Sequence, residues 1–227
     1  NQLSIGQSFN SQAASHPNSP SVSQTFLQYN CNGLRHSSAE LNSFLQKSGV
    51  KVACLQETKL SSTTKSPFFA NYTVLRRDRP TGRGGGLAIL VHHSVLFTHI
   101  DSSSIFPGDG TAELLGISAT INGSPIIVLN VYIPPSSSCP PNYEPDFESL
   151  VNFSDGDLIV CGDFNAHHGA WYSATACSQD AVRGDNLASA LTDSSLCVIN
   201  SDSPTRLPSN GSASSPDVTL ISAHLAL

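Results

Sequence analysis

Methionine is absent from all 227 residues of this sequence, and charged residues make up only 12% of it. Because translation begins at methionine, we expect residue 1 to lie inside a longer protein, of which this chain is a piece. The charged fraction is well below the roughly one quarter of typical domains, so Ser, Thr and Asn should supply much of the surface polarity. The formal net charge of −6 excludes a general attraction for nucleic acid or acidic membranes. A polyanionic partner would have to be held by local basic groups or a bound cation.

Paired cysteines and long apolar runs are also missing. The six cysteines show no CxxC pair and no zinc-site spacing. Cys54, Cys161 and Cys197 lie in apolar runs, where a free cysteine behaves as a small buried hydrophobic residue. We therefore expect a reduced, intracellular compartment. No run approaches the ~18 apolar residues that cross a bilayer, and no basic-then-apolar signal segment is present, so we expect no membrane partner.

The length permits one domain with a full hydrophobic core, and no internal repeat is visible. Residues 1–24 are mostly Ser, Gln, Asn and Pro, which predicts a disordered lead-in or linker. Residues 25–227 are predicted to form the folded domain.

Apolar runs bounded by turn residues predict many short strands and few helices. One helix is signalled by the capping box Ser37-Ser-Ala-Glu40 and the terminating Gly49, with apolar residues on one face between them. Further helices are predicted over residues 145–151 and 184–191, and strands over residues 26–29, 50–55, 72–75, 87–91, 114–121, 126–133, 158–161, 196–199 and 218–221.

These elements predict an α/β fold in which two sheets pack face to face. The segment Ile121-Asn-Gly-Ser-Pro125 is a hairpin signal, so a simple alternating parallel sheet does not fit. Two packed, mainly antiparallel sheets with helices on the outside accommodate many strands and few helices.

The most informative segment is Asp157-Leu-Ile-Val-Cys-Gly-Asp-Phe-Asn-Ala166, in which a buried strand is followed by polar residues. If strand geometry continues past Gly162, the side chains of Asp163 and Asn165 point to the same side. A carboxylate beside a neutral amide suits the handling of a water molecule and a phosphate oxygen. The alternative is a loop whose polar residues serve only solubility.

Polar residues also stand at the ends of other predicted strands, where they can converge on one rim. They are Asn30, Asn32, Glu57, Asn130, Tyr132 and Asp217. Taken singly, each has an ordinary interpretation: a surface carboxylate for Glu57, packing for Tyr132, and a turn after Pro216 for Asp217. Taken together in this order, they favour chemistry on a phosphate.

Each group has a task in such chemistry. Mg²⁺ prefers oxygen ligands and keeps several waters, so Glu57 is a candidate ligand, with Asn30 or Asn32 reaching a metal-bound water. Asp163 is a candidate to orient or deprotonate an attacking water. Asn165 and the Tyr132 hydroxyl are candidates to hydrogen-bond the charge that develops on phosphoryl oxygens. Asp217 is a candidate to orient a histidine.

The strand-end residues belong to five short motifs, which are, in order, Asn30-Cys-Asn-Gly33, Gln56-Glu-Thr58, Asn130-Val-Tyr-Ile-Pro134, Gly162-Asp-Phe-Asn-Ala166 and Ser215-Pro-Asp217. In this order the motifs resemble those of the endonuclease/exonuclease/phosphatase superfamily. More narrowly they resemble the AP-endonuclease-like domain that precedes the reverse transcriptase in non-LTR retrotransposon polyproteins. The resemblance runs from about Phe26 to Ser222, and His167-His168, Trp171 and Arg83-Gly-Gly-Gly-Leu-Ala-Ile favour the retroelement branch over repair enzymes.

The resemblance implies a four-layer, DNase I-like sandwich with its active site at one rim. It implies hydrolysis of a phosphodiester in double-stranded DNA with Mg²⁺, or alternatively Mn²⁺, leaving a 3′-hydroxyl that primes reverse transcription. It also implies nuclear action after cytoplasmic synthesis as part of a retroelement particle. The family roles fall on Asn30 and Glu57 for metal, Tyr132 for phosphate, Asp163 and Asn165 for the attacking water and transition state, and Asp217 for the catalytic histidine. Asn32 stands where repair members carry a metal-assisting aspartate, so its role is less secure.

The sequence departs from the family at its end, because the Ser-Asp-His motif that finishes the family pattern does not occur. His224 follows the Asp217 strand too closely to replace it. The pair His92-His93 is expected to mark a strand end, and for His167-His168 a structural or DNA-flanking role is favoured over catalysis. We expect this chain to lack the last core strand and to be crippled or inactive, while the parent protein is a nuclease.

Basic residues near the motifs are the candidate DNA contacts. Arg35 and Lys59 directly follow motif residues, and Arg183, Arg206 and Asn210 are further candidates. The stretch from Arg76 to Arg83 fits a solvated loop and a DNA contact equally well. Residues 205–214 contain the turn signal Asn210-Gly211. In resembling endonucleases a hairpin here probes the minor groove, which selects by groove width and flexibility.

Two other functions remain open. The first is another phosphodiesterase of the same superfamily, such as an abasic-site repair nuclease or a phosphatase, because fold alone does not separate these activities. The second is a truncated, non-catalytic DNA-binding module.

Overall fold

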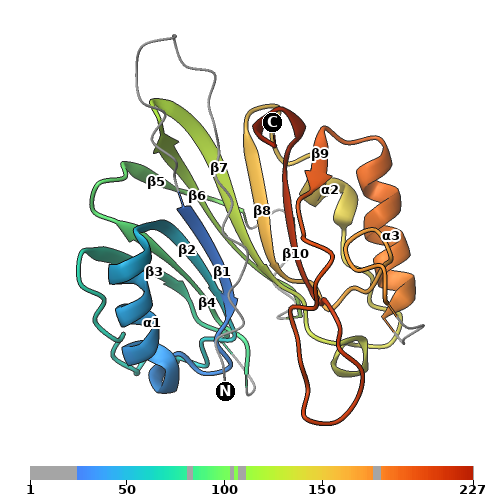
Figure 1. Ribbon diagram of the computed structural model, residues 1–227, viewed down its shortest axis with the longest axis horizontal. Coiled ribbons are helices and arrows are strands. Elements are labelled where there is room, and N and C mark those ends of the chain that lie inside the picture. Colours follow the sequence, from blue (N-terminus) through green and yellow to red (C-terminus); the bar gives the residue numbers. More distant parts are fainter. Residues whose placement is uncertain (1–24, 81–83, 103–104, 107–110, 176–179, 227) are drawn as a thin grey trace.

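Two β-sheets lie face to face in the computed structural model (Figure 1), which describes residues 25–80, 84–102, 105–106, 111–175 and 180–226. The first sheet has the strand order β1-β2-β4-β3 and the second has the order β5-β6-β7-β8-β10-β9. Among the described strands, β1–β2 and β7–β8 are the parallel pairs and the other pairs are antiparallel. The strands are β1 (Thr25–Asn30), β2 (Val50–Gln56), β3 (Tyr72–Arg77), β4 (Leu87–His92), β5 (Phe97–Ile100), β6 (Glu113–Ile121), β7 (Ser124–Tyr132), β8 (Leu158–Asp163), β9 (Leu196–Val198) and β10 (Asp217–Ser222).

Helices cover the outer face of each sheet and complete four layers (Figure 1). The helix α1 (Leu34–Ser48) lies on the first sheet, whereas α2 (Phe147–Val151) and α3 (Ala181–Thr192) lie on the second. Short 3₁₀ turns occupy η1 (Ser136–Ser138) and η2 (Ala223–Leu225). The predicted α/β sandwich of two packed, mainly antiparallel sheets is therefore confirmed.

Three clusters of buried apolar side chains separate the layers. The central cluster joins the inner faces of the two sheets and includes Val52, Ile89 and Val128. A second cluster lies under α1, and a third lies between the second sheet and its helices. Burial of these faces is the main favourable term in folding, because apolar surface leaves water.

The first helix begins at Leu34, three residues before the predicted capping box, so the predicted start is wrong. Gly33 precedes it with a φ of 114°, and Ser37 lies inside the helix. Main-chain carbonyls of residues 57–58 accept hydrogen bonds from the amides of Gly33 and Leu34 at 2.8 and 2.9 Å. These carbonyls satisfy free amides at the helix start in place of a side-chain cap. The predicted stop is confirmed, because Gly49 has a left-handed φ of 65°.

Other local signals match the structure closely. The predicted hairpin joins β6 to β7 through Asn122 and Gly123, whose φ values of 50° and 86° suit a tight hairpin turn. His92 ends β4, as expected. The strand β5 was not predicted, because this short edge strand carries the exposed polar residues Thr98 and His99.

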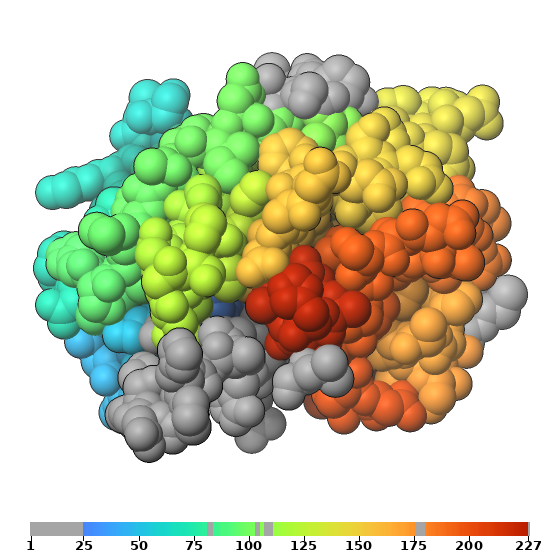
Figure 2. Space-filling view, turned by 90° about the horizontal axis from the view of Figure 1, so that it is seen from above, coloured from blue at the N-terminus to red at the C-terminus, as the bar shows by residue number. Residues whose placement is uncertain are grey.

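The end of the molecule seen in Figure 2 is closed by the C-terminal turn. The red turn lies between the end of β8 and the residues around β9. Two contacts hold it there: the Ala223 amide donates to the Ser195 carbonyl at 2.9 Å, and His224 pairs with Asp157 at 2.8 Å. Asp157 directly precedes β8, so His224 is tied to the start of this strand, whereas Asp163 lies at its other end.

Within the described residues, no helix combines the length and apolar character needed to span a membrane. The segments 1–24 and 81–83 and the cysteine Cys177 lie outside the described residues.

We predict that Gly162→Ala destabilises the fold. A Cβ on Gly162 would lie 2.7 Å from the carbonyl carbon of Val131 on the neighbouring strand, and backbone in a paired strand cannot move away. We expect a loss of about 3 kcal/mol in the free energy of unfolding, or roughly 10 °C in Tm, measured by thermal denaturation. Gly169→Ala is the matched control, because nothing lies within 4 Å of its added Cβ. Equal melting temperatures for the two variants would contradict the prediction.

Candidate active site

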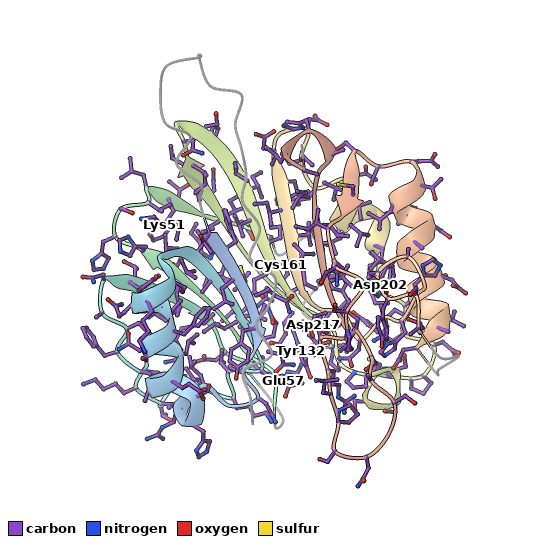
Figure 3. The ribbon with its side chains drawn as sticks, in the orientation of Figure 1. Lys51, Glu57, Tyr132, Cys161, Asp202 and Asp217 are labelled. Atoms are coloured by element: carbon purple, nitrogen blue, oxygen red, sulfur yellow. The ribbon has the colours of Figure 1, made fainter. Side chains whose placement is uncertain are left out.

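The register of the second sheet brings polar side chains to one end of four neighbouring strands. Glu113 on β6 is the partner of Tyr132 on β7. Tyr132 is the partner of Asp163 on β8, which lies opposite Asp217 on β10. Figure 3 shows Tyr132 and Asp217 close to Glu57, which follows β2 of the first sheet. Polar groups from distant parts of the sequence therefore meet at one rim between the sheets.

Buried amides connect the two sheets beside this row. Gln28 Nε2 donates to Asp217 Oδ1 at 2.7 Å and to Gln56 Oε1 at 3.3 Å. Gln56 Nε2 donates to Asn130 Oδ1 at 2.6 Å, and Asn130 donates to two main-chain carbonyls of the first sheet. Gln56 and Asn130 are fully buried. Because an unpaired buried amide is costly, this chain of bonds fixes how the sheet ends meet.

Asn30 bridges the carboxylates that the two sheets contribute. Its Nδ2 donates to Glu57 Oε1 at 3.0 Å and to Asp163 Oδ2 at 2.7 Å. Its Oδ1 accepts from the Asn32 amide at 3.0 Å. The other oxygen of Asp163 accepts from the Asn165 amide at 3.0 Å. Among the described residues, each Asp163 oxygen therefore has one donor, which leaves a lone pair for a further partner such as a water molecule.

The loop that carries Glu57 is held in an uncommon conformation. Glu57 and Lys59 have positive φ values of 49° and 52°, which are rare for residues with a side chain. Residues 33–34 donate to the carbonyls of this loop, and its amides donate to the carbonyls of residues 85–86 at 2.9 and 3.0 Å. Four main-chain bonds therefore hold the loop and aim the Glu57 carboxylate at Asn30.

Asn165 reaches the site by a different route from the one predicted. The strand β8 ends at Asp163, and Asn165 has a left-handed φ of 44°. Strand alternation therefore does not place the two side chains on one side. Instead, the main-chain amide of Asn165 donates back to Asp163, and the side-chain Nδ2 of Asn165 donates to the Ile133 carbonyl at 2.9 Å. One of its two side-chain amide hydrogens is used in this way, and the second has no partner among the described residues.

Burial and like charge dominate the electrostatics of the rim. Burial raises the pKa of Asp163 well above its usual value, and the neighbouring Asp217 carboxylate raises it further. Burial also raises the pKa of Asp217, although hydrogen bonds from Thr205 and Gln28 oppose the shift. Burial, followed by the Glu57 and Asp163 carboxylates, raises the pKa of Tyr132. The site thus concentrates negative charge that favours a cation or a proton.

The oxygen donors at the rim fit a hard divalent ion. Within the described residues, no three or more His, Cys, Asp or Glu side chains form a metal cluster, so Glu57 would act with amide oxygens and waters, as in Mg²⁺ sites. Lys59 Nζ lies 3.3 Å from Glu57 Oε2 and donates to Asn32 Oδ1. The Lys59 ammonium therefore lies between two of the candidate ligands, where a metal cation would be expected. The donor chemistry therefore fits the ion that the sequence predicted.

The candidate DNA contacts divide into exposed and buried residues. Arg35, Lys59, Arg206 and Asn210 are exposed, as a phosphate or groove contact requires. Arg183 is buried at 4% exposure, and its Nη1 donates to the Pro134 carbonyl at 2.8 Å and to the carbonyls of residues 164–165 at 3.3 Å. The prediction that Arg183 contacts DNA is therefore wrong. Its guanidinium instead clamps the loops that follow β7 and β8.

The segment before β10 forms the predicted hairpin. Arg206 and Ser214 exchange main-chain hydrogen bonds of 2.9 and 3.1 Å, and Gly211 at the turn has a φ of 106°. Asn210 and Leu207 are exposed on this loop. It projects from the rim between the two sheets in Figure 1, beside the Asp217 end of β10.

Asp217 has no histidine partner in the described part of the chain, where its side chain accepts from Gln28 and from Thr205 at 2.5 Å. His168 stacks on Trp171 with ring centroids 5.2 Å apart. Burial lowers the pKa of His167, whose main chain packs against Gly184. Both are contacts within the protein, and the role favoured from the sequence for this pair stays a prediction.

Sequence reasoning missed Gln28, Gln56 and Glu113 as parts of the site, and it placed Arg79 only in a basic stretch that fitted a solvated loop and a DNA contact equally well. The usable signal was a glutamine inside an apolar strand, which must find a partner when buried. Arg79 lies with its Cζ 5.6 Å from the centroid of the Tyr132 ring and pairs with Glu113. Nothing in the local sequence links these three residues.

Solved structures share this fold. The endonuclease domain of TRAS1, a telomere-specific non-LTR retrotransposon, superposes with a TM-score of 0.63 and is 21% identical, covering 87% of this chain and 84% of that chain. The AP endonuclease LMAP from Leishmania major gives a TM-score of 0.69 at 16% identity, covering 98% and 86%. At these identities the likeness shows the fold.

Sequence comparisons give matches to related proteins. A family described as endonuclease-reverse transcriptase matches residues 126–227, which is less than half of the chain. Two relatives from Drosophila melanogaster are probable RNA-directed DNA polymerases, from transposon X-element (29% identical over 188 residues) and from transposon BS (27% over 192). Each alignment covers 80% of this chain, and the chain spans 19% of the length of each relative.

The sequence and the fold are therefore similar to those of endonuclease domains of the non-LTR retrotransposon type. The rim between the sheets is where the polar side chains of this chain converge.

We predict that Asp217→Asn stabilises this domain in EDTA at pH 7. The folded pKa of Asp217 is raised, so its contribution to stability is full at low pH and is lost as the pH rises through that pKa. The neutral amide can still accept from Gln28 and avoids repulsion with Asp163. The expected gain is about 1 kcal/mol at pH 7, or 2–4 °C in Tm, and it vanishes below the ordinary aspartate pKa of about 3.9. Thermal denaturation from pH 3 to 8 measures it. A variant that is less stable than the parent at pH 7 would contradict the prediction.

Proposed function

We propose that this domain hydrolyses one strand of double-stranded DNA and leaves a 3′-hydroxyl that primes reverse transcription. The observation that carries the proposal is the Glu57–Asn30–Asp163 bridge, which holds two carboxylates from different sheets around one amide. It lies beside Tyr132 and Asn165, which supply hydroxyl and amide groups. The relatives, named as transposon RNA-directed DNA polymerases, support a reverse transcriptase domain in the parent polyprotein.

Mg²⁺, or alternatively Mn²⁺, is the proposed cofactor, held by Glu57 with Asn30 and Asn32 around it. When bound, such an ion would neutralise phosphate charge as a Lewis acid. Lys59 competes for the same oxygens, because it pairs with Glu57 and Asn32. Release of Lys59 from this pair would make its ammonium available to a DNA phosphate.

The remaining roles follow from the hydrogen bonds. Asp163 accepts a proton from the attacking water, since its raised pKa suits a general base and each of its oxygens keeps a free lone pair. The Asn30 side chain and the main-chain amide of Asn165 keep the Asp163 carboxylate in place. The second amide hydrogen of Asn165 and the Tyr132 hydroxyl donate to phosphoryl oxygens as charge develops there. Asp217, held by Gln28, orients a histidine that none of the described residues supplies.

We predict that the 227-residue chain nicks supercoiled plasmid more slowly than a longer form of the parent protein that carries a Ser-Asp-His motif. Glu57→Gln in that longer form should lower the nicking rate by about 10²-fold or more, because the amide removes the charged ligand. The same change should weaken Mn²⁺ binding measured by calorimetry. Lys47→Gln, on the exposed far end of α1, serves as the control.

Equal nicking by the short and longer proteins would refute the argument from the absent histidine. If neither protein nicks but both bind DNA, the domain is a non-catalytic binding module. Release of phosphate from small phosphomonoesters without nicking would favour the phosphatase alternative, and cleavage confined to abasic sites would favour a repair nuclease.

We predict that the hairpin of residues 207–214 chooses where the DNA is cut. It is exposed, projects beside Asp217 and carries Asn210 near its turn. Replacing these residues with an equally long Gly/Ser hairpin should shift the nick positions without abolishing nicking, because a groove probe selects the site but does no chemistry. Sequencing of nicked products gives the map. An unchanged map would defeat this role.

We further propose that the domain acts in the nucleus, where chromosomal DNA is available, after synthesis in the cytoplasm as part of a retroelement particle. The observation behind this is indirect: a primer for reverse transcription must be made on the target DNA itself.

A further inference from the structure

Arg79 is a partly buried cation of the rim that the proposed chemistry does not use. It follows β3 and crosses to the second sheet, where its Nε donates to Glu113 Oε1. Its Cζ lies 5.6 Å from the centroid of the Tyr132 ring. Its side chain is 15% exposed, and that of Glu113 is 6% exposed. A guanidinium in this position sits directly over the residue assigned to the phosphate.

The surrounding backbone is shaped to keep Arg79 there. The second oxygen of Glu113 accepts from the Gly86 amide at 2.6 Å, so both carboxylate oxygens are engaged. A Cβ on Gly85 would lie 2.6 Å from Arg79 Cζ, and this glycine has a left-handed φ of 63°. Glu113 and the glycines thus fix the guanidinium plane over Tyr132.

Within the described residues, most donors of this guanidinium have no close hydrogen-bond partner. Nε is taken by Glu113, and one Nη2 hydrogen has only a long contact of 3.5 Å with the Thr111 carbonyl. In the described ranges, Nη1 has no hydrogen-bond partner. Arginine presents its donors in a planar fork that matches phosphate oxygens. A fork with free donors beside Tyr132 has the geometry of an anion-binding group.

The charge balance of the rim calls for such a group. Glu57, Asp163 and Asp217 place carboxylates where, on the proposed function, the negatively charged DNA backbone must approach, and the whole chain carries −6. Lys59 is paired with Glu57 on one side. Arg79 is the positive group on the Tyr132 side, in an enclosed place where its attraction is screened less than at the surface.

We propose that Arg79, aimed by Glu113, binds a backbone phosphate of the DNA at this rim together with Tyr132. The inference rests on the proposed DNA-cleaving function. Glu113 is then a positioning residue, because it acts through Arg79 and touches no substrate.

The test is the salt dependence of binding to a short DNA duplex in EDTA, measured by fluorescence anisotropy. Arg79→Gln should weaken binding about tenfold and reduce the slope of log Kd against log salt by about one, since one phosphate contact is lost. Lys47→Gln removes the same charge at the far end of α1 and should leave the slope unchanged.

A double variant separates phosphate binding from mere neutralisation of Glu113. Arg79→Gln alone leaves a buried carboxylate unpaired and should lower Tm, whereas Arg79→Gln/Glu113→Gln removes both charges and should restore it. We expect the binding defect and the reduced slope to persist in the double variant. If they disappear when Tm is restored, Arg79 only neutralises Glu113, and the proposal is wrong while the DNA-cleaving function stands. A parent chain that fails to bind DNA at all would overturn both.

Discussion

The hydrogen bonds that cross between the two sheets are the constraint on which the site depends. An apolar interface alone is non-directional and would tolerate small slides of one sheet over the other. The amides of Gln28, Gln56 and Asn130 remove that freedom, because their donors and acceptors match in one arrangement only. Asn30 then ties Glu57 to Asp163. Sheet packing and site geometry are therefore one structural problem.

This arrangement costs stability at the rim. Asp163 and Asp217 lie opposite each other on neighbouring strands, where like charges repel, and burial disfavours their ionised forms. Glu57 and Lys59 adopt left-handed backbone conformations that the surrounding main-chain bonds enforce. Three apolar clusters offset these costs elsewhere. Strain and like charge collect where a cation and a phosphate would relieve them, which is typical of sites shaped for a ligand.

Much of the fold was predictable because a buried strand appears in the sequence as a local run of apolar residues. The apolar runs before Asp163 and Glu57 gave strands within about two residues of those observed. Contacts between residues far apart in the chain have no such local pattern. Arg183 looks like a surface arginine in sequence, yet it is buried by three carbonyls from two loops. The start of α1 was missed because its cap comes from the carbonyls of residues 57–58.

The candidate site shows the same division. Its strand-end residues were predictable as a set, since neighbouring strands must end near each other. The position of Asn165 was not, because a left-handed turn replaces strand geometry after Asp163. Gln28 was missed, and the position of Arg79 was left undecided, because their partners, Asp217 and Glu113, lie far along the chain.

Because the chain is acidic overall, the positions of its exposed cations determine where DNA could approach. With a net charge of −6, DNA gains no general attraction, so approach must follow the few places where positive charge is exposed. Lys59 lies two residues after Glu57, and Arg35 and Arg206 stand just beyond or before other strand ends of the rim. Each cation is therefore carried by the segment that also carries a polar group of the site. The backbone bonds that hold the Glu57 loop also hold Lys59. Under the proposed function, such a surface would follow the path of the DNA backbone, and the exposed hairpin would be the element that senses groove shape.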